Sequence, residues 1–154
     1  MNIITQELLR LLNREEVKHE LILHRPTHTS AESALARNES LEVGAKALVL
    51  KTGSGFCIVV LSASKKLESR KAKVLFAGKK IRFATKEELF ELTGLNPGSV
   101  PPFGYPLLPF KLIIDLSITK LPYVAFNAGS LEISIKMSVS DYLNVSKGEL
   151  ADVT

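Results

Sequence analysis

Apolar side chains recur at helical spacing in several stretches of the chain. Leu8, Leu9, Leu11 and Leu12 fall on or near one stripe, which predicts an amphipathic helix from Thr5 to about Arg14. Two S/T-x-x-E patterns mark further helix starts, because the hydroxyl and the carboxylate satisfy free backbone amides in the first turn. Together with a basic amphipathic stretch, the pattern predicts four short helices: Thr5 to Arg14, Thr29 to about Asn38, Leu67 to Phe76 and Thr85 to Thr93.

Continuous or alternating apolar runs predict strands between these helices. The clearest pair is Ala45 to Lys51 and Phe56 to Leu61, which Thr52-Gly53-Ser54-Gly55 joins into a hairpin because glycine supplies the positive φ of such turns. About six or seven strands interleaved with four short helices indicate one α+β domain with a mixed sheet. The further predicted strands are Val17 to His24, Lys80 to Ala84, Lys111 to Leu116, Tyr123 to Asn127 and Leu131 to Met137.

The segment from Asn96 to Pro106 holds the densest set of Pro and Gly residues in the chain. It predicts a stiff loop, and a stiff loop can aim backbone N–H groups at a ligand or stabilise a developing oxyanion. A rigid connector that shields the core explains the same composition. After a last helical turn from Ser140 to Leu143, we expect the polar tail to be disordered.

Composition narrows the class of protein. The chain has 154 residues, of which 45% are hydrophobic and 23% charged, as in a single globular domain. No apolar run approaches the roughly 18 residues of a membrane span, so we expect a cytoplasmic protein. Cys57 is the only cysteine, which excludes an intrachain disulfide and a cysteine-based zinc site, and its apolar neighbours indicate an inert thiol. The three histidines do not share a local face, so neither a metal nor another cofactor is expected.

Charge is concentrated in one part of the sequence. The net charge of +4 favours polyanions only weakly, but nine cations lie between Lys65 and Lys86 against one acid, Glu68. Either these residues form a basic face for nucleic acid, or they are the solvated surface of a helix and a strand. The nine are Lys65, Lys66, Arg70, Lys71, Lys73, Lys79, Lys80, Arg82 and Lys86.

Lys46 is the candidate chemical group of the strand from Ala45 to Lys51. Strand alternation places it on the same face as Leu48 and Leu50, and a lysine rarely enters such surroundings unpaired because desolvating an ammonium is costly. From the pattern alone, a lysine that reaches solvent along its own methylenes at the strand end is the more common arrangement.

Three blocks of sequence, in order and spacing, resemble the YbaK-type family. They are Gly44 to Lys51, Gly94 with Gly98 to Gly104, and Phe126 to Ser130, and the likeness runs from about residue 20 to residue 143. This family includes the editing insertion domain of bacterial prolyl-tRNA synthetase and its free-standing relatives. The resemblance implies a compact mixed α/β fold around a curved sheet, and hydrolysis of the ester that joins a wrong, small amino acid to tRNA.

The resemblance also implies roles for particular residues. Lys46 falls on the family's functional lysine, which is thought to orient the terminal adenosine and its phosphate, and Gly98 to Pro102 falls on the G-x-x-x-P loop that frames the aminoacyl end. Some relatives carry a polar residue after the lysine, where this chain has Ala47, so the amino acid removed is left open. The expected catalytic residues are Lys46 and Gly98, and the expected substrate-binding residues are His28, Ala47, Ser99, Val100, Pro101, Pro102, Gly129 and Ser130.

We therefore expect a free-standing deacylase that binds the 3′ end of a mischarged tRNA, with an aminoacyl-tRNA synthetase as a further candidate partner. No side chain is an obvious general base, so positioning of water and substrate is expected to carry much of the rate. A non-catalytic module that holds tRNA or a synthetase through its basic segment is the alternative. A hydrolase of small free esters is a third hypothesis.

Overall fold

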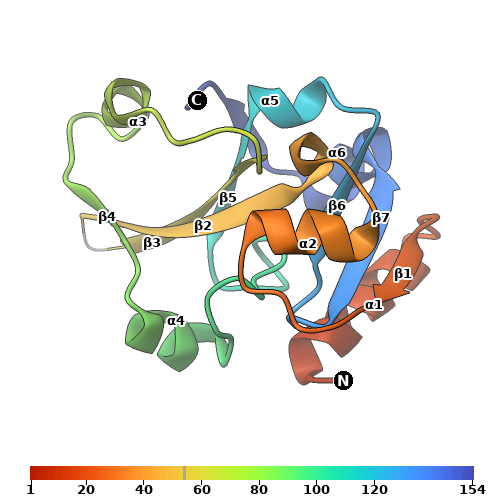
Figure 1. Ribbon diagram of the computed structural model, residues 1–154. Coiled ribbons are helices and arrows are strands. Elements are labelled where there is room, and N and C mark those ends of the chain that lie inside the picture. The colour runs from red at the N-terminus through yellow and green to blue at the C-terminus, as the bar shows by residue number, and fades with distance from the viewer. Residues whose placement is uncertain (54) are drawn as a thin grey trace.

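The computed structural model describes residues 1–53 and 55–154. Within that part of the chain, helices cover two separate β-sheets (Figure 1). The helices are α1 (Ile3–Arg14), α2 (Ser30–Arg37), the 3-10 helix η1 (Leu41–Val43), α3 (Ser69–Leu75), α4 (Lys86–Thr93), α5 (Leu116–Thr119) and α6 (Val139–Ser146). The strands are β1 (Glu20–Leu23), β2 (Ala45–Thr52), β3 (Gly55–Ser62), β4 (Ile81–Phe83), β5 (Lys111–Asp115), β6 (Tyr123–Asn127), β7 (Ile133–Ser138) and β8 (Glu149–Ala151).

The larger sheet has the strand order β4-β2-β3-β5-β8 and mixes both kinds of pairing. The hairpin of β2 and β3 is antiparallel, from the pair Ala45 and Ser62 to the pair Thr52 and Gly55, as the sequence predicts. Ser54 of the predicted turn lies outside the described residues. Strands β5 and β8 then add in parallel to β3.

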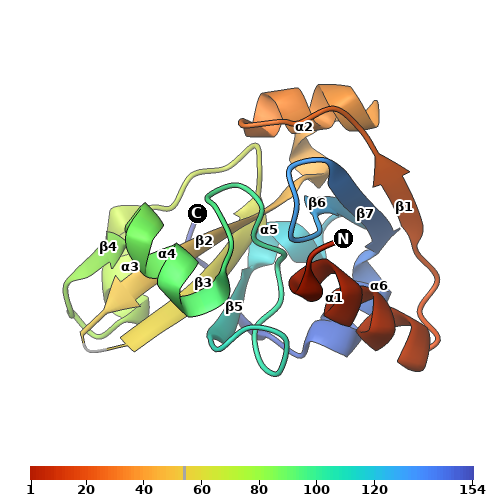
Figure 2. The same ribbon diagram turned by 90° about the horizontal axis from the view of Figure 1, so that it is seen from below.

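The smaller sheet is antiparallel, with the order β1-β7-β6. A single bridge between Gly44, just before β2, and Ala125 in β6 brings the two sheets together. Figure 2 shows α2 lying across this junction, with α1 and α6 beside the smaller sheet. The mixed α+β class is confirmed, whereas the predicted single sheet of six or seven strands is divided into two sheets, because β1 and β6 pair with β7 rather than with a strand of the larger sheet.

Apolar residues fill both faces of the larger sheet. One face packs against the smaller sheet and α1 in the main core, which includes Leu8, Val60 and Phe126. The other face, which includes Leu50 and Val59, packs under α3. Both faces of β3 are covered, which explains why its sequence is a continuous apolar run rather than an alternating pattern.

Helix α2 is held at both ends. At its start, Thr29 accepts a hydrogen bond from the N–H of Glu32, but the Glu32 carboxylate accepts from the N–H of His28 rather than from that of Thr29. After its end, Glu39 accepts from Tyr123 and Lys136 of the smaller sheet, each at 2.7 Å. These contacts fix the helix over the sheet junction.

The C-terminal tail is ordered, so the prediction of disorder is wrong. Helix α6 is twice as long as the predicted turn, since it spans eight residues, and β8 extends the larger sheet. Val153 is fully buried, and its N–H donates to the Asp115 carboxylate at 2.8 Å. The tail is polar in composition, but its few apolar side chains and a buried acceptor elsewhere in the chain are sufficient to hold it.

Candidate functional site

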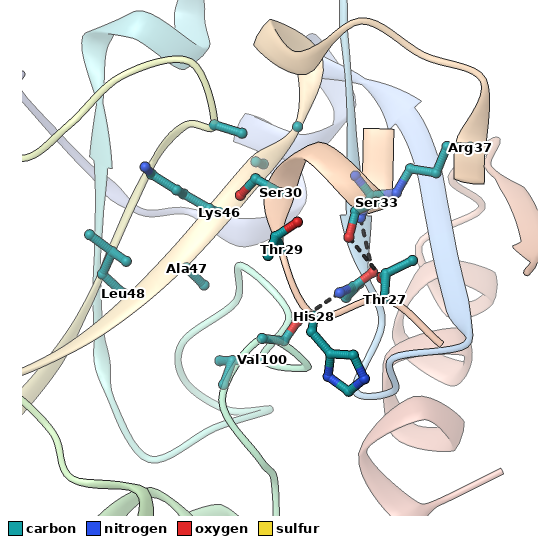
Figure 3. Close-up of a pocket in the computed structure, with 15 residues that line it drawn as sticks. Thr27, His28, Thr29, Ser30, Ser33, Arg37, Lys46, Ala47, Leu48 and Val100 are labelled. Atoms are coloured by element: carbon teal, nitrogen blue, oxygen red, sulfur yellow. Dashed lines mark hydrogen bonds between the residues drawn. The ribbon is translucent and has the colours of Figure 1, made fainter. Parts of the chain in front are cut away.

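A cavity of about 210 Å³ opens where the two sheets meet beneath α2 (Figure 3). Strand β2 forms one wall, and the segment that leads into α2 forms another. The loop before β5 and the end of β6 complete it. The lining residues are Thr27, His28, Thr29, Ser30, Ser33, Arg37, Gly44, Ala45, Lys46, Ala47, Leu48, Ala63, Gly98, Val100 and Asn127.

Lys46 extends from β2 along the cavity and is half-buried. Its Nζ donates to the carbonyl oxygen of Lys65 at 2.7 Å, which leaves two further N–H donors on the ammonium. Burial, and then the nearby charge of Lys66, lower the pKa of Lys46. The main chain therefore orients this side chain, at a position that burial partly desolvates.

The edge of β2 is open beside Lys46. Strand β4 covers this edge only from Leu50 to Thr52, and the N–H of Ala84 reaches the carbonyl of Val49. Because backbone groups alternate in direction along a strand, the N–H and C=O of Ala47 point to the same side as those of Val49. The cavity wall thus presents a main-chain donor and acceptor at Ala47.

The Pro/Gly loop, residues 96–106, brings Gly98 and Val100 to the lining of the cavity. Gly98 has a φ of +88°, a backbone conformation that side chains disfavour, and its carbonyl accepts from Asn127 Nδ2 at 2.7 Å. The N–H of Ser99 donates to Asn96, so the N–H groups of Gly98 and Val100 are the loop's candidates for contact with a ligand.

Five of the ten predicted site residues line this cavity: His28, Lys46, Ala47, Gly98 and Val100. The other five do not line it, although Ser99 and Gly129 are bonded to each other next to it. The carbonyl of Ser99 accepts from the N–H of Gly129, and Gly129 is packed so closely that an added Cβ would lie 3.0 Å from Thr5 Oγ1. The other three residues of this group are Pro101, Pro102 and Ser130, and the roles assigned to all ten stay predictions.

Arg37 and Asn127 are cavity residues that the sequence analysis did not single out. Arg37 ends α2, and its guanidinium donates to Ser134 Oγ at 2.8 Å and to Asn127 Oδ1 at 3.0 Å. Burial lowers the pKa of Arg37 to about 10, although the Glu39 carboxylate opposes the shift. Asn127 lies inside one of the blocks that carry the family resemblance, so the sequence could have indicated it as a site residue. For Arg37 the sequence indicated only a position near the end of a helix.

Hydroxyl groups cluster at the start of α2. The Oγ atoms of Thr27 and Ser33 lie 2.8 Å apart, and both residues are buried. Thr29 and Ser30 add two hydroxyls at the cavity (Figure 3). In the same view, the ring of His28 points away from Lys46. This wall can exchange hydrogen bonds with a small polar group.

Other candidate chemistry is sparse among the described residues. No group of three or more His, Cys, Asp or Glu side chains there is arranged to hold a metal ion. Burial raises the pKa of Cys57 to about 11, which makes its thiol a poor nucleophile. None of the described helices combines the length and apolar character needed to cross a membrane.

A second, basic groove lies at the far end of β2. It gathers part of the predicted basic segment, since four of the nine cations line it. Strand β2 contributes Lys51 to the groove. Arg82, its partner on β4, is paired with Glu88 by two hydrogen bonds of 2.7 and 3.0 Å. The cations of this groove are Lys51, Lys73, Lys79, Lys80 and Arg82.

Comparisons with known proteins agree with this geometry. The Multifunctional Ser/Thr-tRNA deacylase ProXp-y of Escherichia coli K12 is 31% identical over 153 residues, which cover 96% of this chain and 90% of that protein. A solved structure described as a candidate trans-editing enzyme for prolyl-tRNA synthetase matches with a TM-score of 0.84 and 25% identity, over 100% of this chain and 98% of that one. The hypothetical protein APE2540 matches with a TM-score of 0.84 and 27% identity, over 96% and 98%.

The family model described as the aminoacyl-tRNA editing domain matches residues 24–145. That range contains every residue that lines the cavity. The family model and the similar deacylase confirm the family predicted from the sequence. They also confirm the class of reaction, deacylation of aminoacyl-tRNA. This chain belongs to the aminoacyl-tRNA editing domain family.

Proposed function

We propose that this chain acts as a free-standing deacylase that hydrolyses the ester of a mischarged tRNA carrying a small amino acid. One observation carries the proposal: β2 and the Pro/Gly loop bring Lys46 and Gly98, far apart in sequence, to the lining of one cavity. The family match and the similarity to a tRNA deacylase over 96% of this chain support it.

In this proposal, Lys46 binds the 3′ end of the RNA. The lysine already donates one hydrogen bond to a backbone carbonyl, so its position is set before substrate arrives. Its remaining N–H groups are suited to a phosphate or ribose oxygen, for which lysine acts as a point charge. The lowered pKa of Lys46 has burial as its main cause, and pairing with a phosphate would favour the charged form again.

The loop polarises the ester carbonyl. Backbone N–H groups of Gly98 and Val100 are held in place by the loop's conformation and donate to the oxygen as negative charge develops there. A water molecule attacks the carbonyl carbon, the bond between this carbon and the tRNA 3′ oxygen breaks, and that oxygen takes a proton that the water gives up. The carbonyl oxygen of Ala47, at the open edge of β2, is a suitable acceptor for the α-ammonium group of the aminoacyl end.

Small hydroxyl amino acids are the proposed substrates. The cavity is small, and its wall at Thr27, Ser30 and Ser33 offers hydroxyls to a serine or threonine side chain. The named substrates of the similar E. coli protein, serine and threonine, support the same choice. A site built for hydrogen bonds discriminates against analogues that lack the bonding group.

The tRNA body is the proposed occupant of the basic groove. Lys46 and Lys51 are five residues apart on β2, which corresponds to roughly 17 Å of strand. A 3′ end bound at the cavity would therefore leave the adjoining phosphates near these cations. We place the activity in the cytoplasm, where charged tRNA is handled, and an aminoacyl-tRNA synthetase remains a proposed partner.

The experiment is a deacylation screen of the purified protein against tRNAs charged with Ser, Thr, Ala and Cys. We expect turnover of Ser- or Thr-tRNA well above the spontaneous rate, and less turnover of Ala-tRNA. Salt-dependent RNA binding without hydrolysis of any ester would instead favour the non-catalytic binding module, for which the basic groove is the supporting observation. Hydrolysis of small free esters at comparable rates would point to the third hypothesis.

A further inference from the structure

A hydrogen-bonded chain of side chains connects the end of α2 to the Pro/Gly loop. The Nε and Nη2 atoms of Arg37 donate to Ser134 Oγ and Asn127 Oδ1. The same Asn127 oxygen lies 3.1 Å from Ser134 Oγ. On the other side of the amide, Asn127 Nδ2 donates to the carbonyl oxygen of Gly98 at 2.7 Å.

The orientation of the Asn127 amide follows from Arg37. A guanidinium carries only donors, so the amide oxygen must face Arg37, and the amide NH₂ must then face Gly98. Arg37 is only partly exposed, and the described residues give its guanidinium no carboxylate in direct contact. If the Asn127 amide were rotated by half a turn, its NH₂ would face the N–H donors of Arg37. Its oxygen would then face the carbonyl oxygen of Gly98, and neither contact could form a hydrogen bond.

We propose that Asn127 is a positioning residue of the deacylation reaction, with Arg37 as the group that sets its direction. It acts by holding the carbonyl of Gly98, and through it the N–H groups of Gly98 and Val100, at the cavity wall. This inference rests on the proposed function of the loop and adds the side chains that make the loop rigid. Asn127 and Gly129 both belong to the hairpin formed by β6 and β7. A second bond, from the N–H of Gly129 to the carbonyl of Ser99, ties the next residue of the loop to this β6–β7 hairpin.

The substitution Asn127→Asp separates positioning from stability. The new carboxylate still accepts from Arg37, in a charge-assisted bond that is stronger than the original. It has no donor for Gly98, and its second oxygen repels that carbonyl. The fold should therefore keep its melting temperature, while the loop loses one of its two ties to the hairpin.

The expected result is a kcat about five- to tenfold lower on the best aminoacyl-tRNA, the loss typical of one hydrogen bond, with KM nearly unchanged. Amide hydrogen exchange provides a readout that does not need activity. The N–H groups of Ser99 and Gly129 should exchange faster by a similar factor, while amides of the β2–β3 hairpin stay as protected as in the wild type. A purely structural role would lower the melting temperature and protection throughout the chain.

Wild-type kcat together with wild-type exchange at Ser99 in Asn127→Asp would overturn the inference, and so would a loss of protection that is spread evenly over a variant that still folds. Should that variant fail to fold, Asn127→Ser makes the same test without a charge, because its short side chain does not reach Gly98. A wild-type protein that deacylates no tRNA would refute the proposed function, and the exchange measurement would still decide whether Asn127 holds the loop.

Discussion

The backbone conformation at Gly98 predicts that a single added methyl group impairs the reaction. With a φ of +88°, an alanine at this position costs about 1–2 kcal/mol, less a few tenths for the reduced entropy of the unfolded chain. Crowding adds little, since the new Cβ would lie 3.5 Å from Leu131 Cδ2, an ordinary contact. We therefore expect Gly98→Ala to lower the stability by about 1 kcal/mol, or the melting temperature by roughly 2–4 °C.

The chain contains a matched control in Gly94, which ends α4. Its φ is +72°, and no atom lies within 4 Å of an added Cβ, so Gly94→Ala carries the same backbone strain without a place in the cavity. Both variants should lose similar stability in urea or thermal unfolding. Only Gly98→Ala should lose activity, by about tenfold in kcat, because relief of the strain moves its carbonyl away from Asn127. Equal kcat in the two variants would refute the role given to the loop.

Two further predictions concern acid stability and RNA contact. Burial alone would raise the pKa of Asp115. Hydrogen bonds from Ser117, Val153 and Thr154 outweigh this effect, so that the pKa lies below its ordinary value. The carboxylate therefore stabilises the fold above its unfolded pKa of about 3.9, and this stability is lost as pH falls through the folded pKa. The free energy of unfolding of Asp115→Asn should be about 1–3 kcal/mol below wild type at pH 7, and the gap should narrow toward pH 3; a constant gap would contradict the assignment. In the basic groove, Lys79→Gln should weaken tRNA binding and reduce the slope of log K against log salt by about 0.7–0.9, whereas the exposed Lys18→Gln should change neither.

Local sequence signals predicted most of the fold. The hairpin of β2 and β3 follows from two apolar runs around a glycine turn, and the capping box at Thr85 is present with both of its hydrogen bonds. The C-terminal strand could not be predicted in this way. Its order depends on the buried Asp115 and on an open strand edge, both of which are contributed by residues that precede the tail by more than thirty positions.

The candidate site was predictable where it rests on sequence blocks and not where it rests on packing. Lys46 and Gly98 lie in blocks that resemble the family, and the structure brings them to one cavity. The contribution of Arg37 depends on how α2 crosses the sheet junction, which no local pattern encodes. The hydroxyl pair of Thr27 and Ser33 likewise forms only when the segment before α2 folds back over the helix.

The central claim is that Lys46 binds the substrate of a deacylase, and the most direct test is the turnover of Lys46→Ala. On the best substrate of the screen, loss of a charged hydrogen bond to the RNA predicts kcat/KM lower by about ten- to a hundredfold. The exposed Lys18→Ala, with the same change in net charge, should behave as wild type. Unchanged kcat/KM in Lys46→Ala, in a folded protein, would contradict the account.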